Sequence, residues 1–374
     1  MIDKNIYLDY SATTMPDDKV IERFNEVAKN YYANPNSNHF KGKESNNLIK
    51  NAEEIISKYF GVSTEELIFT SGASESNNMA LKGLEYESGR SKIITTPLEH
   101  SSIVGPLGYL QKQGVIIEFL ELNSDGTVSI EDLKKKLDDD VVLVSVCAVD
   151  SETGTREPIE EIGEILKNHK TLFHVDLTQA VGKVSVNLQN VDMASFSGHK
   201  IYSFKGIGGL IKKEGINITP LIHGGKSTTI FRSGTPQTEL IVSLGEAFNI
   251  ISEKFNEKYE YVKSLNECIK KYLEKYDKVV VNSTNKSIPH ILNVSFIGKN
   301  ANDTQKFFEE NNILISTKTA CASNMDMSKT VYSLTKSEER AKSSVRFSLS
   351  YRTTIEEVDQ LLKVIDKYMV EVCK

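Results

Sequence analysis

Two residues near the middle of the chain could do chemistry together, an aspartate that ends an apolar run and a lysine in a small polar turn. Asp176 ends the run FHVD, and Lys200 ends the stretch SFSGHK further along the chain. Taken singly, Asp176 could cap the segment LTQAVGK that follows it, and Lys200 could be a solvated surface charge. Taken together, an amine can hold a carbonyl group as a Schiff base, and a carboxylate can keep a ring nitrogen protonated.

A third feature could bind an anion. The stretch ELIFTS leads through SGASESNN into a helical pattern, so a glycine turn feeds the N-terminus of a helix. Backbone N–H groups at such an end attract anions, and Ser74 and Ser76 could add hydroxyl donors. The alternative is that Ser74 only caps the helix. An amine, a carboxylate and an anion site are what pyridoxal 5'-phosphate requires for its aldehyde, its ring nitrogen and its phosphate.

The elements that would carry these residues alternate between short apolar runs and helical patterns. Seven runs predict strands, namely ELIFTS, SKIITT, VIIEFLE, VVLVSVCAV, TLFHVD, MASFS and GGLIK. Helical stretches such as 129–139 and 159–169 lie between them. This alternation indicates βαβ units and an α/β fold with a mainly parallel seven-stranded sheet, in which ligands gather at the carboxyl ends of the strands.

The C-terminal third follows a different pattern. A long helical segment is expected over 239–276, and a closing helix over 354–372. Between them, the runs KVVVNS, ILNVSFI, NILIST and SVRFSLS predict strands. We therefore expect a large domain over residues 15–250 and a smaller α+β domain formed by residues 1–14 and 251–374.

Composition narrows the class of protein. The chain has 374 residues, of which 39% are hydrophobic and 26% charged, so it can bury a substantial core. Its net charge of −6 argues against direct nucleic-acid binding. No apolar run approaches the ~20 residues that span a bilayer, and the scattered cysteines form no C-x-x-C pair. We expect a cytoplasmic protein with neither a disulfide framework nor a metal site.

Eight motifs, taken together and in order, resemble one family. They are YLDYSATT (7–14), FTSGASESNN (69–78), LEH (98–100), HVDLTQAVGK (174–183), SFSGHKIY (195–202), RSGTP (232–236), TACAS (319–323) and SSVRFSLS (343–350). This set resembles the cysteine desulfurases, which belong to the class V aminotransferase group of fold-type I pyridoxal phosphate enzymes. The resemblance implies a fold-type I aminotransferase-like large domain, a smaller α+β domain, and pyridoxal 5'-phosphate as cofactor.

The resemblance also implies roles for individual residues around the cofactor. Lys200 corresponds to the Schiff-base lysine, Asp176 to the carboxylate that faces the pyridine nitrogen, and His100 to the histidine stacked on the ring. Gln179 corresponds to the amide that hydrogen-bonds the ring hydroxyl oxygen. The phosphate contacts that the resemblance implies are Ala73, Ser74, Ser197, His199 and, from the neighbouring subunit of a homodimer, Thr235.

For the substrate and the reaction, the resemblance implies Arg346 as the residue that binds the carboxylate of L-cysteine, with Asn34 as a further substrate contact. Cys321 corresponds to the nucleophile, whose thiolate attacks the substrate sulfur, releases alanine and keeps the sulfur as a persulfide. Its sequence context resembles the subgroup with the longer catalytic loop. Delivery of the sulfur to an acceptor protein, for iron–sulfur cluster assembly or tRNA thiolation, is the implied outcome.

Three segments depart from the family pattern. Ser151, in DSE, replaces an asparagine that lies near the cofactor and substrate. Lys226, Ser227 and Thr228 replace a usual Gln-Glu-Arg, and Lys318 stands where glycine is common. Two further functions therefore stay open: a selenocysteine lyase or other class V aminotransferase-type enzyme, and a non-catalytic scaffold of the same fold.

Overall fold

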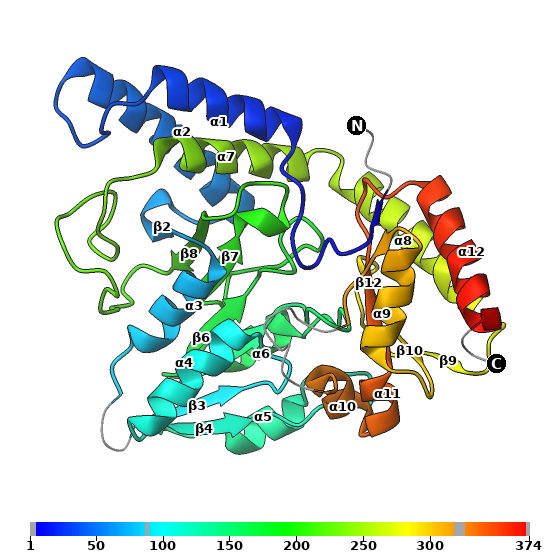
Figure 1. Cartoon of the computed structure of the whole chain (residues 1–374). Coiled ribbons are helices and arrows are strands. Elements are labelled where there is room, and N and C mark those ends of the chain that lie inside the picture. The colour runs from blue at the N-terminus through cyan, green and yellow to red at the C-terminus, as the bar shows by residue number, and fades with distance from the viewer. Residues whose placement is uncertain (1–4, 87–89, 318–325, 372–374) are drawn as a thin grey trace.

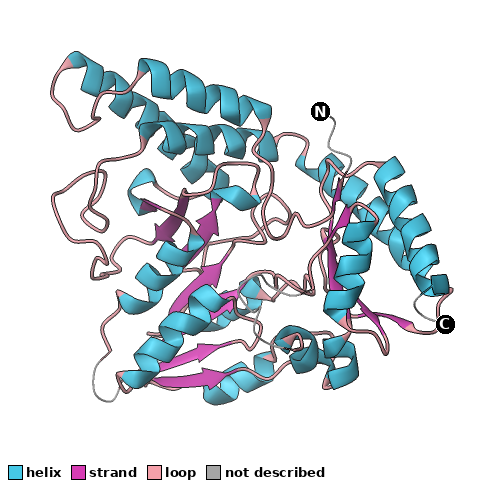
Figure 2. Cartoon of the chain, in the orientation of Figure 1, coloured by secondary structure: helices cyan, strands magenta, loops and turns pink. Residues whose placement is uncertain are grey.

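The computed structural model describes residues 5–86, 90–317 and 326–371 of the chain. A twisted central sheet with helices on both faces forms the larger part, and a smaller assembly of strands and helices lies beside it (Figures 1 and 2). Among the described residues, no helix is both long and apolar enough to cross a membrane.

The central sheet confirms the predicted architecture, because all seven predicted strands form and lie in one sheet. In spatial order they are β2 (Leu67–Thr70), β8 (Gly208–Lys212), β7 (Met193–Ser197), β6 (Leu172–Asp176), β5 (Val141–Cys147), β3 (Lys92–Thr95) and β4 (Ile116–Phe119). Only β8 runs antiparallel to its neighbours β2 and β7, and the other adjacent pairs are parallel. The sheet is therefore mainly parallel, as the βαβ pattern requires.

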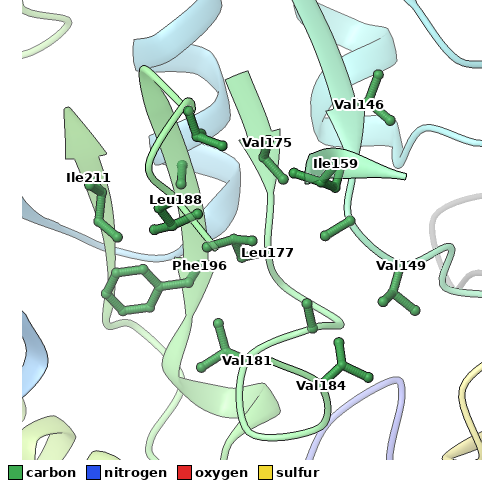
Figure 3. Packing of buried hydrophobic residues seen from close by; sticks show 14 of the residues in the cluster. Val146, Val149, Ile159, Val175, Leu177, Val181, Val184, Leu188, Phe196 and Ile211 are labelled. Carbon is green, nitrogen blue, oxygen red and sulfur yellow. The ribbon is translucent and has the colours of Figure 1, made fainter. Parts of the chain in front are cut away.

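Both faces of the sheet are buried, which explains why its strands are apolar almost throughout. On β5, Val144 and Val146 join one core cluster while Leu143 joins another, as the two-residue alternation of a strand demands. Figure 3 shows the first cluster around Val146, Val175 and Phe196. Helices α2 (Phe40–Phe60), α5 (Ile130–Lys136), α6 (Ile159–Leu166) and α7 (Thr238–Ser252) contribute to the first cluster, and α3 (Ala73–Lys82) and α4 (Ser101–Lys112) to the second. Helix α1 (Asp18–Asn30) packs on α7.

The smaller part has its own apolar core. Its strands β12 (Ser344–Ser348), β10 (Ile291–Phe296) and β9 (Val279–Val281) form an antiparallel sheet, and β1 (Ile6–Tyr7) pairs in parallel with β11 (Ile313–Leu314). Its helices are α8 (Phe255–Leu273), α9 (Ala301–Glu310), α10 (Lys329–Thr335), α11 (Glu338–Lys342) and α12 (Ile355–Glu371). The pairing of β1 with β11 brings the N-terminal segment to this part, while the exact domain boundaries stay a prediction.

The prediction of one long helix over 239–276 was wrong in one respect, because the chain breaks it between α7 and α8. Lys254 adopts a left-handed conformation with φ of 51°, which ends one helix direction and starts another. The two halves serve different cores: α7 buries Phe248 in the large one, and α8 buries Leu265 in the small one. A single straight helix could not reach both, and periodicity alone does not reveal such a break.

Candidate active site

One cavity of about 420 Å³ lies at the carboxyl ends of the sheet strands, where parallel sheets bind ligands. It is closed on the other side by the segment after β1 and by Arg346 of β12. The predicted site residues that line it are Ala73, Ser74, His100, Ser151, Asp176, Gln179, Ser197, His199, Lys200 and Arg346. Folding therefore gathers residues that lie up to 273 positions apart, from Ala73 to Arg346, around one space.

Asp176 ends β6, is buried and lines this cavity. One carboxylate oxygen, Oδ2, accepts a hydrogen bond from Nδ2 of Asn77 at 2.8 Å, and Oδ1 accepts one from the backbone N–H of Thr178 at 2.8 Å. The residues after Asp176 form turns rather than a helix, so the helix-cap alternative for Asp176 is wrong. Two donors hold the carboxylate at the cavity in a defined orientation.

Lys200 lies in the short 3₁₀ turn η2 (Gly198–Lys200) that follows β7. Its Nζ donates to the carbonyl oxygens of Ser11 at 2.5 Å and Ala12 at 2.7 Å, and the side chain lines the cavity. Lys200 therefore lines the cavity and is not a solvated surface charge. The amine is directed into the cavity by carbonyl groups of the N-terminal segment.

The glycine turn before α3 leaves backbone donors at the cavity. Gly72 precedes the helix with a φ of 146°, a conformation that favours glycine, and no side chain of the described residues caps α3. The amides of Ala73 and Ser74 make no hydrogen bond within the described part of the chain. The alternative of Ser74 as a helix cap is thus wrong. Two open amides and the positive end of the α3 dipole form a place for an anion.

A close approach of β8 completes this cradle. A Cβ added to Gly208 would lie 2.7 Å from the Cα of Gly72 and 2.5 Å from the carbonyl oxygen of Phe196. Ser197, at the end of β7, lines the same space, and a Cβ on Gly72 would meet its Oγ at 3.4 Å. Glycine at both positions lets the turn, the strand end and the helix N-terminus converge.

Two histidines line the cavity, and their surroundings favour the neutral imidazole. Burial, and next the positive charge of Lys200, lowers the pKa of His199 to about 4, and its Nδ1 lies 3.1 Å from Oγ1 of Thr13. Burial also lowers the pKa of His100, against the opposing effect of Asp176. Nδ1 of His100 accepts from the backbone N–H of Ser102 at 3.1 Å, which fixes the ring at the start of α4.

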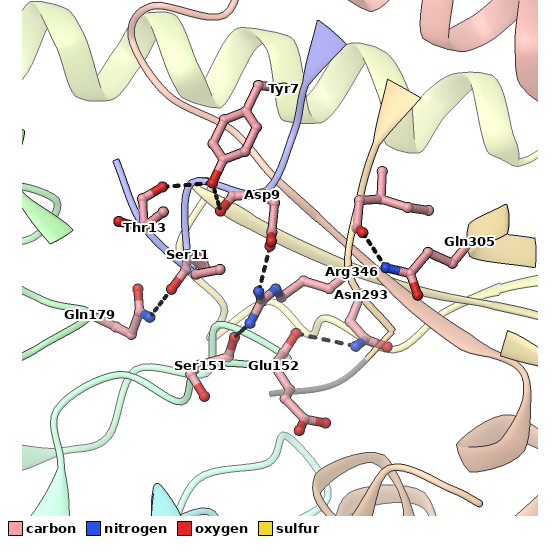
Figure 4. A network of polar contacts seen from close by, with 12 residues as sticks. Tyr7, Asp9, Ser11, Thr13, Ser151, Glu152, Gln179, Asn293, Gln305 and Arg346 are labelled. Carbon is pink, nitrogen blue, oxygen red and sulfur yellow. Dashed lines mark hydrogen bonds and ion pairs between the residues drawn. The ribbon is translucent and has the colours of Figure 1, made fainter. Parts of the chain in front are cut away.

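Gln179 occupies the turn after β6 and connects two parts of the site. Its Nε2 donates to the carbonyl oxygen of Ser11 at 2.8 Å (Figure 4), and its Oε1 accepts from Nζ of Lys183 at 2.8 Å. Burial, and next the positive charges of Lys200 and Arg346, lowers the pKa of Lys183 to about 7. Gln179 is buried, so it is not the solvated surface residue that a glutamine in a first turn often is.

Arg346 reaches the cavity from the smaller part of the molecule, with only 2% of its surface exposed. As Figure 4 shows, its guanidinium donates to Oδ1 of Asp9 at 2.7 Å and to the carbonyl oxygen of Ser151 at 2.7 Å. Its buried Nε has no hydrogen-bond partner in the described part of the chain. Arg346 is therefore an interior cation at the cavity and not the strand-edge charge that its strand alone suggested.

Two predicted site residues do not line this cavity, and a third lies outside the described residues. Asn34 is exposed in the turn between α1 and α2, where its Oδ1 accepts from the backbone N–H of Asn36. Thr235 is exposed and does not line the cavity. Cys321 lies outside the described residues, so its role as nucleophile stays a prediction.

Several residues of the site were not singled out from the sequence. Asn77 holds Asp176, Asp9 holds Arg346, and the carbonyl groups of Ser11 and Ala12 hold Lys200. Asn77 lies inside the motif FTSGASESNN, and the other three lie inside YLDYSATT. Their place in those motifs was the sequence signal that could have identified these residues. Neither motif shows which groups form hydrogen bonds with each other.

The residues present fit pyridoxal 5'-phosphate. The cavity offers an amine at Lys200, a carboxylate at Asp176, and between Gly72 and Gly208 a cradle that an added Cβ would crowd. The open amides of Ala73 and Ser74 suit a phosphate. These are the groups that the aldehyde, the ring nitrogen and the phosphate of this cofactor require.

Comparisons with known proteins agree with this geometry. The family model described as aminotransferase class-V matches residues 6–361. The chain is 36% identical to a cysteine desulfurase IscS of Clostridium botulinum, over 98% of this chain and 94% of the relative. It is 37% identical to a cysteine desulfurase IscS of Rickettsia bellii, over 96% and 90%.

Solved structures show the same similarity. A NifS-like protein superposes with a TM-score of 0.92 at 34% identity, covering 98% of this chain and 99% of that one. A structure titled SspA in complex with cysteine superposes with a TM-score of 0.82 at 32% identity, covering 93% and 100%. The chain belongs to the class V aminotransferase family and, within it, to the cysteine desulfurases.

Proposed function

We propose that the protein uses pyridoxal 5'-phosphate to convert L-cysteine to L-alanine, and that Cys321 keeps the removed sulfur as a persulfide. The observation that carries the proposal is the joint placement of Lys200, Asp176 and the Gly72 turn around one cavity. Membership of the cysteine desulfurases supports the reaction type. The solved relative titled as a complex with cysteine supports this substrate.

The cofactor, when bound, supplies an electron sink that lets bonds to the substrate's α- and β-carbons be broken. Asp176, held by Asn77 and Thr178, keeps a ring nitrogen protonated. Lys200 binds the aldehyde carbon and moves a proton at the substrate α-carbon. Arg346, which lines the cavity, binds the substrate carboxylate, for which its planar fork is suited.

In the proposed transfer, the C–S bond of cysteine breaks and a new S–S bond forms to Cys321. The two sulfur atoms together lose two electrons, one each, and the substrate β-carbon gains two and takes up a proton to become the methyl group of alanine, so no outside oxidant is needed. Because the thiolate is the reacting form, Cys321 must lose its proton before it attacks.

The route of the sulfur and the assembly state belong to the same proposal. Cys321 passes the persulfide sulfur to an acceptor protein, for iron–sulfur cluster assembly or tRNA thiolation. Thr235 serves the phosphate site of the neighbouring subunit in a homodimer, which accords with its exposure and with its absence from the lining of its own chain's cavity. Ser151 contributes to the cofactor site, and Asn34, which is exposed and does not line its own chain's cavity, is the further substrate contact of the proposal.

The test reconstitutes the purified protein with pyridoxal phosphate and supplies L-cysteine. Alanine release and persulfide on Cys321, detected by mass spectrometry, are expected for the wild type. Cys321→Ala is expected to lose the persulfide and nearly all turnover, while Cys268→Ala, which changes an exposed cysteine, serves as the matched control.

Other outcomes decide among the remaining functions. Undiminished cysteine turnover by Cys321→Ala would refute the persulfide mechanism. Turnover of selenocysteine but not of cysteine would assign a selenocysteine lyase instead, and a protein that takes up no pyridoxal phosphate would be a scaffold of this fold.

A further inference from the structure

Lys183 is a buried lysine behind the cavity wall, and the proposed reaction does not use it. Only 8% of its surface is exposed, and it does not line the cavity. Its Nζ donates to Oε1 of Gln179 at 2.8 Å, and no carboxylate within the described ranges forms an ion pair with it. Burying an amine without an opposite charge is costly, so its position calls for an explanation.

The hydrogen bonds around Gln179 determine which way its amide faces. A lysine ammonium only donates, so the atom of Gln179 that meets Lys183 must be the oxygen. The carbonyl oxygen of Ser11 only accepts, so the atom that meets Ser11 must be the nitrogen. The second condition holds even when Lys183 is deprotonated, and the two neighbours independently require the same orientation.

This orientation matters because Gln179 lines the cavity and its NH₂ group carries two hydrogens. One hydrogen is used on Ser11, and the other is left for a second acceptor. A flipped amide would present an oxygen instead, and an anionic oxygen of a bound ring would then meet a repelling acceptor. Lys183, when protonated, opposes that flip, because the flip would place the NH₂ group against its ammonium.

The groups around Lys183 carry positive charge. Lys200 and Arg346 act on it, and Lys183 in turn contributes to lowering the pKa of His290 and of His199. A group of cations and neutral histidines on this side of the cavity favours an anion there. Both effects point to the ring hydroxyl oxygen of the cofactor in its ionised form.

We propose that Lys183 is a positioning residue that holds the side-chain amide of Gln179 with its NH₂ group toward the ring oxygen of the bound cofactor. The inference rests on the proposed function only in requiring pyridoxal phosphate in this cavity. Whether cysteine is the substrate does not enter it.

The test follows the colour of the bound cofactor with no amino acid present. Lys183→Met removes the amine and keeps the length of the side chain. We expect about tenfold more pyridoxal phosphate to be needed for half-saturation. We also expect the pH midpoint of the absorption change to rise by about one unit, because Ser11 alone then holds the amide and the ionised ring oxygen loses part of the donation that stabilises it.

Two comparisons separate positioning from general damage. Lys212→Met removes another buried lysine, one whose amine binds the carbonyl oxygens of Lys213 and Ile216 away from the cavity. It is expected to lower stability and leave the pH midpoint unchanged. In a Gln179→Leu background, Lys183→Met should shift the midpoint by only a small further amount, because there is no amide left to orient.

An unchanged midpoint in Lys183→Met, or a full shift in the Gln179→Leu background, would overturn the proposal. A wild type that binds the cofactor but releases no alanine from cysteine would contradict the proposed function alone. A wild type that takes up no pyridoxal phosphate contradicts both.

Discussion

At the scale of single residues, the site depends on side chains that hold other side chains. Asn77 is fully buried and uses both hydrogens of Nδ2, one on Oδ2 of Asp176 at 2.8 Å and one on Oγ of Ser102 at 2.9 Å. Ser102 in turn contacts Nδ1 of His100 at 2.8 Å. One amide therefore connects the carboxylate expected beneath the ring nitrogen with the imidazole expected on the ring face.

Asn77→Ala should weaken cofactor binding without removing any group expected to touch the cofactor. We expect several-fold weaker uptake of pyridoxal phosphate and a loss of about 1 to 3 kcal/mol in unfolding free energy, because a buried carboxylate oxygen loses its donor. Equilibrium titration and urea unfolding measure the two effects. Asn78→Ala, which removes an exposed amide bonded within the same helix, is the control and should change neither by much; equal behaviour of the two variants would count against this role.

At the scale of elements, the anion cradle exists because two backbone segments touch. Gly72 ends the turn before α3, and Gly208 starts β8, with no side chain between them. The alternation of strands and helices predicts both elements, and the glycine turn predicts an anion site. The contact between the two glycines depends on how β8 lies against β2 and β7, which the local sequence does not state.

Gly208→Ala should damage both stability and cofactor binding. The added methyl would lie 2.5 Å from a backbone oxygen and 2.7 Å from a backbone Cα, so the backbone must move, at a cost of about 1 to 3 kcal/mol or more. Thermal unfolding and pyridoxal phosphate titration measure this. The matched control is Gly108→Ala in α4, where an added methyl meets nothing within 4 Å and should stabilise the helix by up to about 1 kcal/mol. If both variants behaved alike, the close approach would not be the cause.

At the scale of the whole molecule, the two parts meet through buried groups as well as through the cavity. His290 immediately precedes β10 of the smaller part and is buried, and its Nδ1 has no hydrogen-bond partner among the described residues. Burial, followed by the charge of Lys183 in the larger part, lowers the pKa of His290 to about 3. The interior thus holds a neutral histidine that the unfolded chain would protonate at about pH 6.5.

This difference predicts acid sensitivity of the fold. Because the folded pKa of His290 is below the unfolded value, the unfolded state binds more protons below about pH 6.5. Stability is therefore lost as pH falls from there toward 3. We expect His290 to contribute up to about 1.4 kcal/mol per pH unit in that range.

Urea unfolding at several pH values measures the slope, and His290→Gln should flatten it. His223→Gln, at an exposed position, should leave it unchanged. An unaltered slope in His290→Gln would show that other groups cause the acid loss.

The sequence by itself determined the seven strands, the mainly parallel sheet and ten residues of the cavity, because each depends on local patterns or on motifs. Periodicity reports which face of an element is apolar, and a motif reports which residue types accompany one another. Periodicity does not reveal the break at Lys254, because the residues on both sides of it keep a helical pattern.

Tertiary structure alone decided which partner each polar group meets. Arg346 pairs with Asp9 across 337 positions, Lys200 bonds carbonyl groups near the N-terminus, and Lys183 orients Gln179. Such contacts depend on the relative placement of elements that are distant in the chain. The free energy of each contact comes from burial, and burial is a property of the packed molecule rather than of any one segment.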